Sequence, residues 1–258
     1  MKKFKEGDVI GISLKDGKKW FVKIEKKTFG THKGNINLEE IIGKDEGSEI
    51  QTNLGHKGYA FYPSLEEIIL YYIRRNTQIA YPKDLGYIIL KLGIKEGTRI
   101  IECGTGTGAT TFVFSHFVGN TGKIYTYENR EEFTQKAQKL IKEFGMEERV
   151  VFKTKDIIDG FDEKDADVLF LDIKNPQDYV EKVFSSLKKG GTFGIIVPTT
   201  NQVSDVLVSL ERIGLVNVEV SEILLRKYKT NPARLRPDDI MIGHTVYIMT
   251  GRNLSIFC

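Results

Sequence analysis

The chain has 258 residues, of which 40% are hydrophobic and 28% are charged, and its formal net charge is +3. These values are typical of a soluble globular protein, with room for one large domain or for a standard domain and a small one. No apolar run is long enough to span a bilayer, and residues 1–8 are too charged for a signal peptide. We therefore expect neither a membrane protein nor a secreted one.

The cysteines and the distribution of charge narrow the class further. Only Cys103 and Cys258 occur, and neither has a partner at metal-ligand spacing. We expect a reduced, cytoplasmic protein with no metal site and no disulfide framework. Residues 1–33 hold ten lysines and four acidic residues, and a second basic cluster lies within 226–236. Charge clusters of this kind are usually solvated surface.

The first 62 residues are predicted to be rich in β-structure. Short strands are expected at 9–14 and 20–25, joined by a hairpin turn at 15–18, and the frequent glycines that follow exclude a long helix. A small barrel or sandwich is the expected result. Ser64 and Glu67 match a capping box and predict that a helix begins there. Residues 74–76 are expected to mark the boundary between two domains, 1–75 and 76–258.

The rest of the chain is predicted to alternate between helix and strand. A helix should open at 81–84, bury Leu85, Ile88, Ile89 and Leu92, and end at Gly93. Repeated βα units then imply a parallel sheet with helices on both faces. The expected strands are 98–103, 122–128, 149–154, 167–172 and 191–197, and the expected helices are 108–118, 130–144, 177–187 and 201–213. Two last strands, near 216–225 and 245–250, should flank a basic loop that contains proline.

The glycine-rich segment 102–108 joins a predicted strand to a predicted helix. Gly104, Gly106 and Gly108 allow a tight turn, in which backbone N–H groups can approach a ligand closely. Glu128 ends the next strand, 20 residues after Gly108, where nucleotide-binding folds place a carboxylate for ribose hydroxyls. An ordinary turn would also use glycine, and both NAD and S-adenosylmethionine (SAM) are compatible with these residues.

Glu102 distinguishes between the two cofactors. The pattern Glu-x-Gly-x-Gly resembles motif I of the SAM-dependent methyltransferases, in which the acid steadies the turn and faces the methionine end of the cofactor. Two later features agree with that class. One is a strand that ends in Asp172, and the other is the segment 188–191, which leads into an apolar strand. We therefore expect an α/β fold: a Rossmann-like, seven-stranded SAM-dependent methyltransferase domain with an antiparallel last strand, preceded by a small β-rich N-terminal domain.

Eight segments carry a more specific resemblance. They are 31–34, 54–56, 75–84, 102–108, 171–176, 198–202, 234–237 and 243–245. In this order they resemble the TrmI family of tRNA (adenine-N1) methyltransferases, which modify adenine 58 in the tRNA T-loop. The resemblance implies methyl transfer from SAM to tRNA in a homotetramer, with the N-terminal domain in tRNA binding or oligomerisation. Two basic clusters beside a methyltransferase core also favour a polyanionic substrate.

The resemblance also implies roles for individual residues. The implied cofactor-binding residues are Ala80, Glu102, Gly104, Gly106, Thr107, Gly108, Ala109, Glu128, Asp156, Ile157 and Asp172. The implied catalytic residues are Asp172 and Tyr81, and the implied substrate contacts are Tyr81, Asn175, Arg234, Arg236 and His244. Lys174 stands where family members often have proline, so the lip of the substrate pocket is expected to differ.

Plainer interpretations stay open beside these roles. Asp156 could simply cap the following turn, Asp172 could cap the turn toward Pro176, Tyr81 could be ordinary packing, and His244 could be a structural histidine. A non-catalytic tRNA-binding subunit is the main alternative function, which the intact glycine segment disfavours. A methyltransferase for a protein or small molecule would leave the basic clusters unexplained. The sequence does not decide whether adenine 57 is also methylated.

Overall fold

Residues 2–73, 80–215 and 217–254 are described by the computed structural model. The chain divides into two units, Met1–Arg74 and Arg75–Cys258, which are considered separately below. The domain boundary expected at 74–76 lies outside the described residues, as does most of the segment 75–79 that contributes to the family resemblance.

The first unit contains a four-stranded antiparallel sheet of order β2-β1-β6-β5. β1 (Val9–Leu14) and β2 (Lys19–Lys23) form the predicted hairpin, which the Leu14 N–H closes by donating to Lys18 O at 3.0 Å. β3 (Thr28–Thr31) and β4 (Gly34–Asn37) make a separate ribbon, and β5 (Glu49–Gln51) and β6 (Lys57–Phe61) complete the sheet. Sheet and ribbon share one apolar core, so among the described strands the arrangement is a small sandwich rather than a closed barrel.

The predicted capping box begins the helix of the first unit. Ser64 Oγ accepts from the Glu67 N–H at 3.2 Å, and Glu67 Oε2 accepts from the Ser64 N–H at 3.1 Å. The helix α1 (Leu65–Glu67) continues as the wider π-helical segment η2 (Ile68–Tyr72). Its side chains Ile68 and Ile69 are buried.

The second unit is built on a seven-stranded sheet of order β12-β15-β11-β10-β7-β8-β9. Its strands are β7 (Arg99–Cys103), β8 (Lys123–Glu128), β9 (Val150–Thr154), β10 (Ala166–Leu171), β11 (Leu187–Val197), β12 (Glu219–Ser221) and β15 (Tyr247–Arg252). The five strands from β9 to β11 are parallel, and β15 runs antiparallel to both β11 and β12. The expected seven-stranded methyltransferase sheet with an antiparallel last strand is confirmed.

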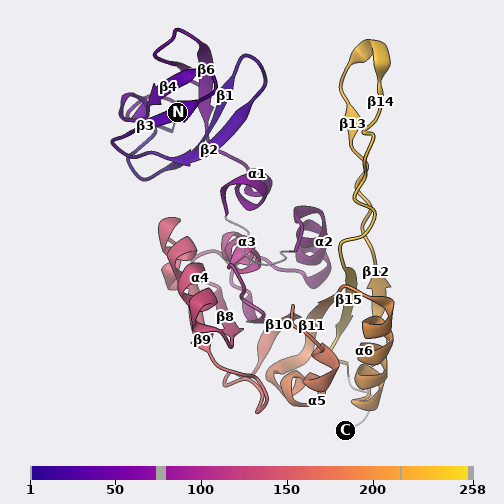
Figure 1. Cartoon of the computed structure of the whole chain (residues 1–258). Coiled ribbons are helices and arrows are strands. Elements are labelled where there is room, and N and C mark those ends of the chain that lie inside the picture. Colours follow the sequence, from indigo (N-terminus) through magenta and orange to yellow (C-terminus); the bar gives the residue numbers. More distant parts are fainter. Residues whose placement is uncertain (1, 74–79, 216, 255–258) are drawn as a thin grey trace. The chain divides into compact units, whose positions relative to one another are not determined.

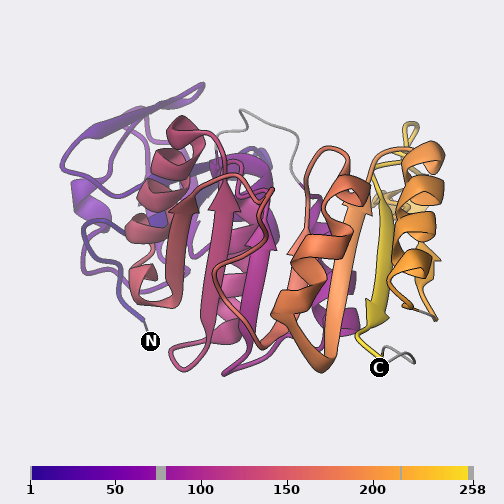
Figure 2. The same cartoon turned by 90° about the horizontal axis from the view of Figure 1, so that it is seen from below.

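Helices cover both faces of this sheet, and Figure 2 shows α5 and α6 on one face with α2 and α3 on the other. The helices are α2 (Pro82–Leu92), α3 (Ala109–Val118), α4 (Glu131–Glu143), α5 (Val180–Val183) and α6 (Thr200–Arg212). α2 buries its four predicted apolar residues and ends at Gly93, whose φ of 67° is left-handed. A single helix at 177–187 was expected, but the structure has three short helical pieces: η4 (Pro176–Asp178), α5 and η5 (Phe184–Ser186).

The segment between β12 and β15 was predicted as a continued strand and a loop, and this prediction is wrong. β12 ends at Ser221, and residues 222–246 leave the sheet as a long, narrow arm, coloured yellow in Figure 1. The short strands β13 (Tyr228–Lys229) and β14 (Arg236–Pro237) pair within the arm. None of the helices in the described residues combines the length and apolar character needed to cross a membrane.

Candidate active site

Gly104 brings the ends of two strands together directly after β7. Its φ is 97°, and a Cβ at this position would lie 2.7 Å from the carbonyl carbon of Asp172, which follows β10. The N–H of Gly104 donates to Tyr127 O of β8 at 2.9 Å. Only glycine allows the backbone to turn here while it touches the chain after β10.

The other two glycines have different uses. Gly106 donates its N–H to Glu128 Oε2 at 3.0 Å, which links the turn to the end of β8. Gly108 has a φ of 82° and precedes α3, and a Cβ there would lie 2.8 Å from Ala137 Cβ of α4. Gly108 is therefore required by the packing of α3 against α4.

A cavity of about 570 Å³ opens at the carboxyl ends of β7, β8, β9 and β10. Its lining residues are Cys103, Gly104, Tyr127, Glu128, Asn129, Arg130, Lys155, Asp156, Ile157, Asp172, Ile173, Lys174, Asn175, Asp178 and Tyr179. Ligands of open α/β sheets bind at this edge, outside the carboxyl ends of the strands. Six residues predicted for the site therefore line the same cavity, namely Gly104, Glu128, Asp156, Ile157, Asp172 and Asn175.

Glu128 is buried, ends β8 and lines the cavity. Its Oε1 accepts from the N–H and the Nε–H of Arg130, at 3.2 and 3.0 Å, while Oε2 accepts from Gly106. These bonds hold the carboxylate at the end of β8. A carboxylate has about four lone-pair sites, so Glu128 can still accept further hydrogen bonds.

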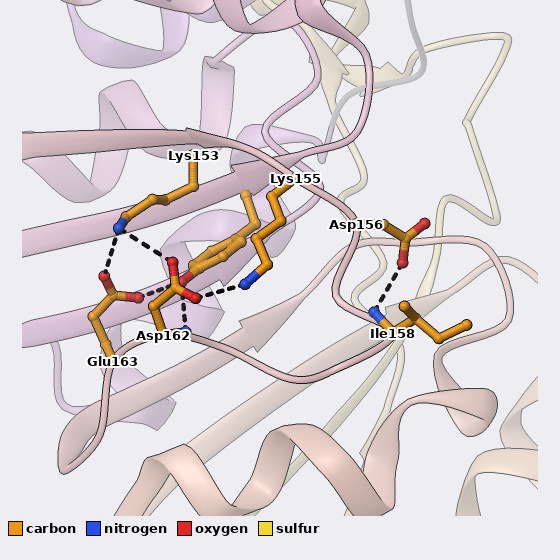
Figure 3. A network of polar contacts seen from close by, with 7 residues as sticks. Lys153, Lys155, Asp156, Ile158, Asp162 and Glu163 are labelled. Atoms are coloured by element: carbon orange, nitrogen blue, oxygen red, sulfur yellow. Dashed lines mark hydrogen bonds and ion pairs between the residues drawn. The ribbon is translucent and has the colours of Figure 1, made fainter.

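Asp156 lies at the start of the loop that follows β9. Its Oδ1 accepts from the Ile158 N–H at 2.9 Å, so the residue does cap the following turn (Figure 3). The same side chain also lines the cavity beside the buried Ile157. Capping and lining are compatible, because the capped turn holds both residues at the cavity wall.

Two acidic groups beneath the glycine turn have raised pKa values. Burial raises the pKa of Glu102 to about 7, although a hydrogen bond from Thr111 at 2.6 Å lowers it and the nearby Asp172 raises it further. Asp172 is partly exposed to the cavity, and burial raises its pKa to about 7 as well. Oε1 of Glu102 is buried without a partner, and no described residue donates to the Asp172 carboxyl group. This arrangement suits a positively charged ligand.

Several predicted residues lie away from the cavity lining. Gly106, Thr107, Gly108 and Ala109 belong to the turn and the start of α3, and none of them is among the residues that line the cavity. Oγ1 of Thr107 is buried without a partner among the described residues. Within the turn 104–108, only Gly104 therefore lines the cavity.

Ala80 and Tyr81 come directly before α2, where Ala80 is buried and Tyr81 is the N-terminal flanking residue. Neither residue is among those that line the cavity. The carbonyl oxygen of Tyr81 accepts from the N–H groups of Asp84 and Leu85, both at 2.9 Å, so its backbone starts the helix.

The three predicted substrate contacts in the C-terminal region belong to the arm. Arg234 and Arg236 are exposed, and Arg236 forms an ion pair with Asp239. His244 lies at the base of the arm, with Nδ1 2.6 Å from Glu222 Oε1 and Nε2 2.8 Å from Pro198 O. The bond to Glu222 raises the pKa of His244. Because both ring nitrogens already have partners, the plainer structural interpretation of this histidine agrees with its contacts.

Some cavity residues were missed in the sequence. They are Cys103, Tyr127, Asn129, Arg130, Lys155, Ile173, Asp178 and Tyr179. Most of them end or directly follow a predicted strand, so the rule that ligands bind at the carboxyl edge could have identified them. Lys174, which differs from the family pattern, also lines the cavity and is exposed. Within the described ranges, no three His, Cys, Asp or Glu side chains group closely enough to hold a metal ion.

The sheet order, the antiparallel β15 and the cavity beside a glycine turn define a methyltransferase of the Rossmann-like class. The chain also matches the family described as "tRNA methyltransferase complex GCD14 subunit" over residues 60–248, and it belongs to that family.

Individual relatives agree with this membership. The TrmI tRNA (adenine(57)-N(1)/adenine(58)-N(1))-methyltransferase of Methanocaldococcus jannaschii is 34% identical, with 92% of each chain covered. The crystal structure of TrmI from Aquifex aeolicus is 40% identical, with a TM-score of 0.84 and coverage of 97% of this chain and 98% of that one. A structure described as a SAM-dependent O-methyltransferase from Thermotoga maritima is 44% identical, with a TM-score of 0.91 and coverage of 96% and 93%.

Proposed function

We propose that this protein transfers a methyl group from SAM to N1 of adenine 58 in the tRNA T-loop. The observation that carries the proposal is the family match over residues 60–248, combined with an acidic cavity that retains Gly104, Glu128 and Asp172. A non-catalytic subunit would have no need of this cavity. On family membership alone, we also propose a cytoplasmic homotetramer whose first unit contributes to tRNA binding or oligomerisation.

The residues of the cavity are compatible with SAM. Gly104 lets the chain after β7 lie directly against the backbone of Asp172 at the cavity. Oε1 of Glu102 and the Asp172 carboxyl group, which have no partner among the described residues, favour a cation. When bound, SAM supplies a methyl group activated by a positively charged sulfur. Glu128 would accept hydrogen bonds from the ribose hydroxyls, and Asp156 and Ile157 would flank the adenine.

Asp172 would orient the substrate base. Adenine N1 carries a lone pair, so attack on the methyl group needs no base to generate the nucleophile. The carboxylate of Asp172 can accept a hydrogen bond from the N6 amino group, which aligns the ring. This bond strengthens as positive charge develops on the ring, and it therefore stabilises the transition state more than the ground state.

The base must leave the T-loop before it can reach this cavity. Enzymes that modify a base within folded nucleic acid extrude it, at an unstacking cost of a few kcal/mol. Contacts between the basic arm and the tRNA phosphates would offset that cost. We therefore assign Arg234 and Arg236 to contacts with the tRNA backbone. Asn175 and Tyr81 are assigned to contacts in the region of the base.

A second acceptor is suggested by the O-methyltransferase description of the Thermotoga maritima structure. Transfer to a hydroxyl group would require a base, and an aspartate with a pKa of about 7, as Asp172 has, could serve. The relatives' names also differ on whether adenine 57 is modified. Mass spectrometry of tRNA incubated with enzyme and SAM distinguishes these possibilities by locating the methyl group.

The catalytic role of Asp172 is tested by Asp172→Ala in a single-turnover assay at saturating tRNA and SAM. We expect a rate loss of roughly 100-fold or more, the scale seen when a preorganised charge-stabilising group is removed. SAM binding, measured by calorimetry, should persist in the same variant. A rate within a few-fold of the wild type would remove the catalytic role from Asp172 and direct attention to Tyr81 and Asn175.

A further inference from the structure

The loop 155–163 follows β9. Its first residues line the cavity, and its last residues contact β9 again. Asp156 and Ile157, near its start, line the cavity. Its middle is closed by a short turn, in which Gly160 N–H donates to Ile157 O at 2.8 Å. The position of the wall therefore depends on what holds the far end of the loop.

A polar network holds that far end (Figure 3). The hydroxyl of Tyr127 donates to Glu163 Oε2 and accepts from the Asp162 N–H at 2.9 Å. Lys153 Nζ lies 3.3 Å from Asp162 Oδ2 and 3.4 Å from Glu163 Oε1. Lys155 Nζ lies 2.6 Å from Asp162 Oδ1. The end of the loop is thus bound to β8 through Tyr127 and to β9 through Lys153.

The contacts of this network differ in strength because they differ in exposure. The side chains of Lys155 and Asp162 are 42% and 43% exposed, so their ion pair contributes little. The Glu163 side chain is only 9% exposed, and Tyr127 is fully buried. Removing Glu163 would leave the buried hydroxyl hydrogen of Tyr127 without an acceptor, although the oxygen would still accept from the Asp162 N–H. The Tyr127–Glu163 bond is therefore the one that matters most.

Tyr127 also belongs to the cavity itself. The residue is among those that line the cavity, and its buried ring packs against Phe161 of the loop, with ring centroids 4.7 Å apart. Its side chain therefore contacts both the loop and the carboxylate that fixes the loop. Any release of Glu163 would move the ring and the wall together.

We propose that Glu163, acting through Tyr127, is a positioning residue that holds the loop 155–163 against the adenosine part of the bound cofactor. The inference rests on the proposed use of SAM and adds a residue outside the family motifs. Glu163 does not line the cavity. It sets cofactor affinity indirectly, by keeping Asp156 and Ile157 in place.

The test compares variants of the full-length protein by calorimetry with SAM and by steady-state methylation of tRNA. Glu163→Leu should weaken SAM binding about 10-fold or more, because the hydroxyl of Tyr127 loses its acceptor. Glu163→Gln retains an oxygen acceptor and should recover most of the affinity. Asp159→Asn is the matched control, since Asp159 is exposed on the same loop and makes no hydrogen bond in the described structure.

The kinetic pattern separates positioning from a general loss of structure. Glu163→Leu should raise KM for SAM, while kcat at saturating SAM and KM for tRNA stay within a few-fold of the wild type. Tyr127→Phe removes the donor of the same bond and also the acceptor of the Asp162 N–H, so adding it to Glu163→Leu should cost less than the sum of the two single changes.

Two outcomes would overturn this inference while the proposed function stands. One is unchanged SAM affinity in folded Glu163→Leu, and the other is additive losses of affinity in the double variant. A loss confined to kcat would also overturn it. Failure of the wild type to bind SAM would overturn the proposed function and this inference together. If Glu163→Leu does not fold, Tyr127→Phe alone decides, because equal SAM affinity in that variant contradicts the proposal.

Discussion

Gly104 occupies the point where the chain after β7 touches the chain after β10. Its φ of 97° is strained for any residue with a side chain, and a Cβ would also overlap the backbone of Asp172. A flexible side chain could move aside, but this neighbour is the main chain directly after β10. The cavity therefore tolerates no larger residue at this position.

Gly104→Ala should destabilise the protein by about 2 kcal/mol or more and abolish measurable SAM binding. Urea unfolding and calorimetry measure the two effects. Gly145→Ala is the matched control, because Gly145 has a φ of 66° but nothing within 4 Å of its Cβ position. Equal behaviour of the two variants would mean that backbone strain alone, and not the contact with Asp172, explains the loss.

The raised pKa values of Glu102 and Asp172 predict a pH dependence of SAM binding. Both values are about 7 in the ligand-free protein, so a fall from pH 8 to pH 6 protonates the pair and removes its attraction for a cation. SAM affinity, measured by calorimetry, and kcat/KM for SAM should both decrease over that range. Because the two groups interact, the apparent values belong to the pair.

The same raised pKa values predict the opposite pH dependence for the stability of the ligand-free protein. Unfolded carboxyl groups titrate near pH 4, so between about pH 4 and 7 the folded state binds more protons than the unfolded state. The contribution of Glu102 and Asp172 to ligand-free stability therefore falls as pH rises through 7. Glu102→Gln should reduce this loss, and thermal unfolding at a series of pH values checks it. A profile unchanged by the substitution would contradict the role of Glu102.

At the scale of elements, the start of α2 is bound to residues near both ends of the arm 222–246. Lys83 Nζ donates to Asp84 Oδ1 at 2.8 Å, to Ile223 O at 2.7 Å and to Thr245 Oγ1 at 2.6 Å. Thr245 in turn donates to Asp84 Oδ2 at 2.8 Å. The side chains of Lys83 and Asp84 are 9% and 0% exposed. Two segments of the family resemblance, 81–84 and 243–245, therefore meet as a buried, fully bonded cluster.

Asp84→Ala should cost about 3–5 kcal/mol of stability, because it leaves the ammonium of Lys83 buried without its carboxylate. The pair Lys91–Glu219 provides the control. It joins α2 to β12 at 2.6 Å, but its side chains are 30% and 61% exposed, so Glu219→Ala should cost about 1 kcal/mol or less. Thermal unfolding compares the two variants, and similar losses would show that the buried cluster is not what anchors the arm.

At the scale of the whole molecule, the charge available to a polyanion is smaller than the count of basic residues suggests. Lys229 and Arg236 of the arm both pair with Asp239. Arg226 and Arg234 make no ion pair in the part of the chain that the structure describes. The unpaired arginines should therefore contribute more to tRNA binding than the paired residues.

Affinity for tRNA should decrease steeply as salt is added, because phosphate contacts release counterions. Arg234→Ala should weaken binding and reduce the slope of log affinity against log salt by about one, whereas Arg236→Ala should change it less. Arg212→Ala, an exposed change on α6, is the control. A slope that Arg234→Ala leaves unaltered would mean that this part of the arm is ordinary solvated surface.

Much of the fold followed from the sequence because its signals are local. The capping box at Ser64 depends on a residue three positions away, and the end of α2 depends on the left-handed Gly93. The alternation of strands and helices likewise reflects short-range apolar periodicity. Gly104, Glu128 and Asp172 could be placed at one edge of the sheet, because parallel strands align their carboxyl ends.

Only the tertiary structure decided which residues line the same cavity and which motif residues serve packing instead. Gly108 is held by its approach to Ala137, and His244 is occupied by Glu222 and Pro198. The Lys83–Thr245 contact joins residues that are 162 positions apart. Contacts at such separations depend on how the sheet stacks its strands and where the arm leaves it, and no local pattern of residues encodes those distances.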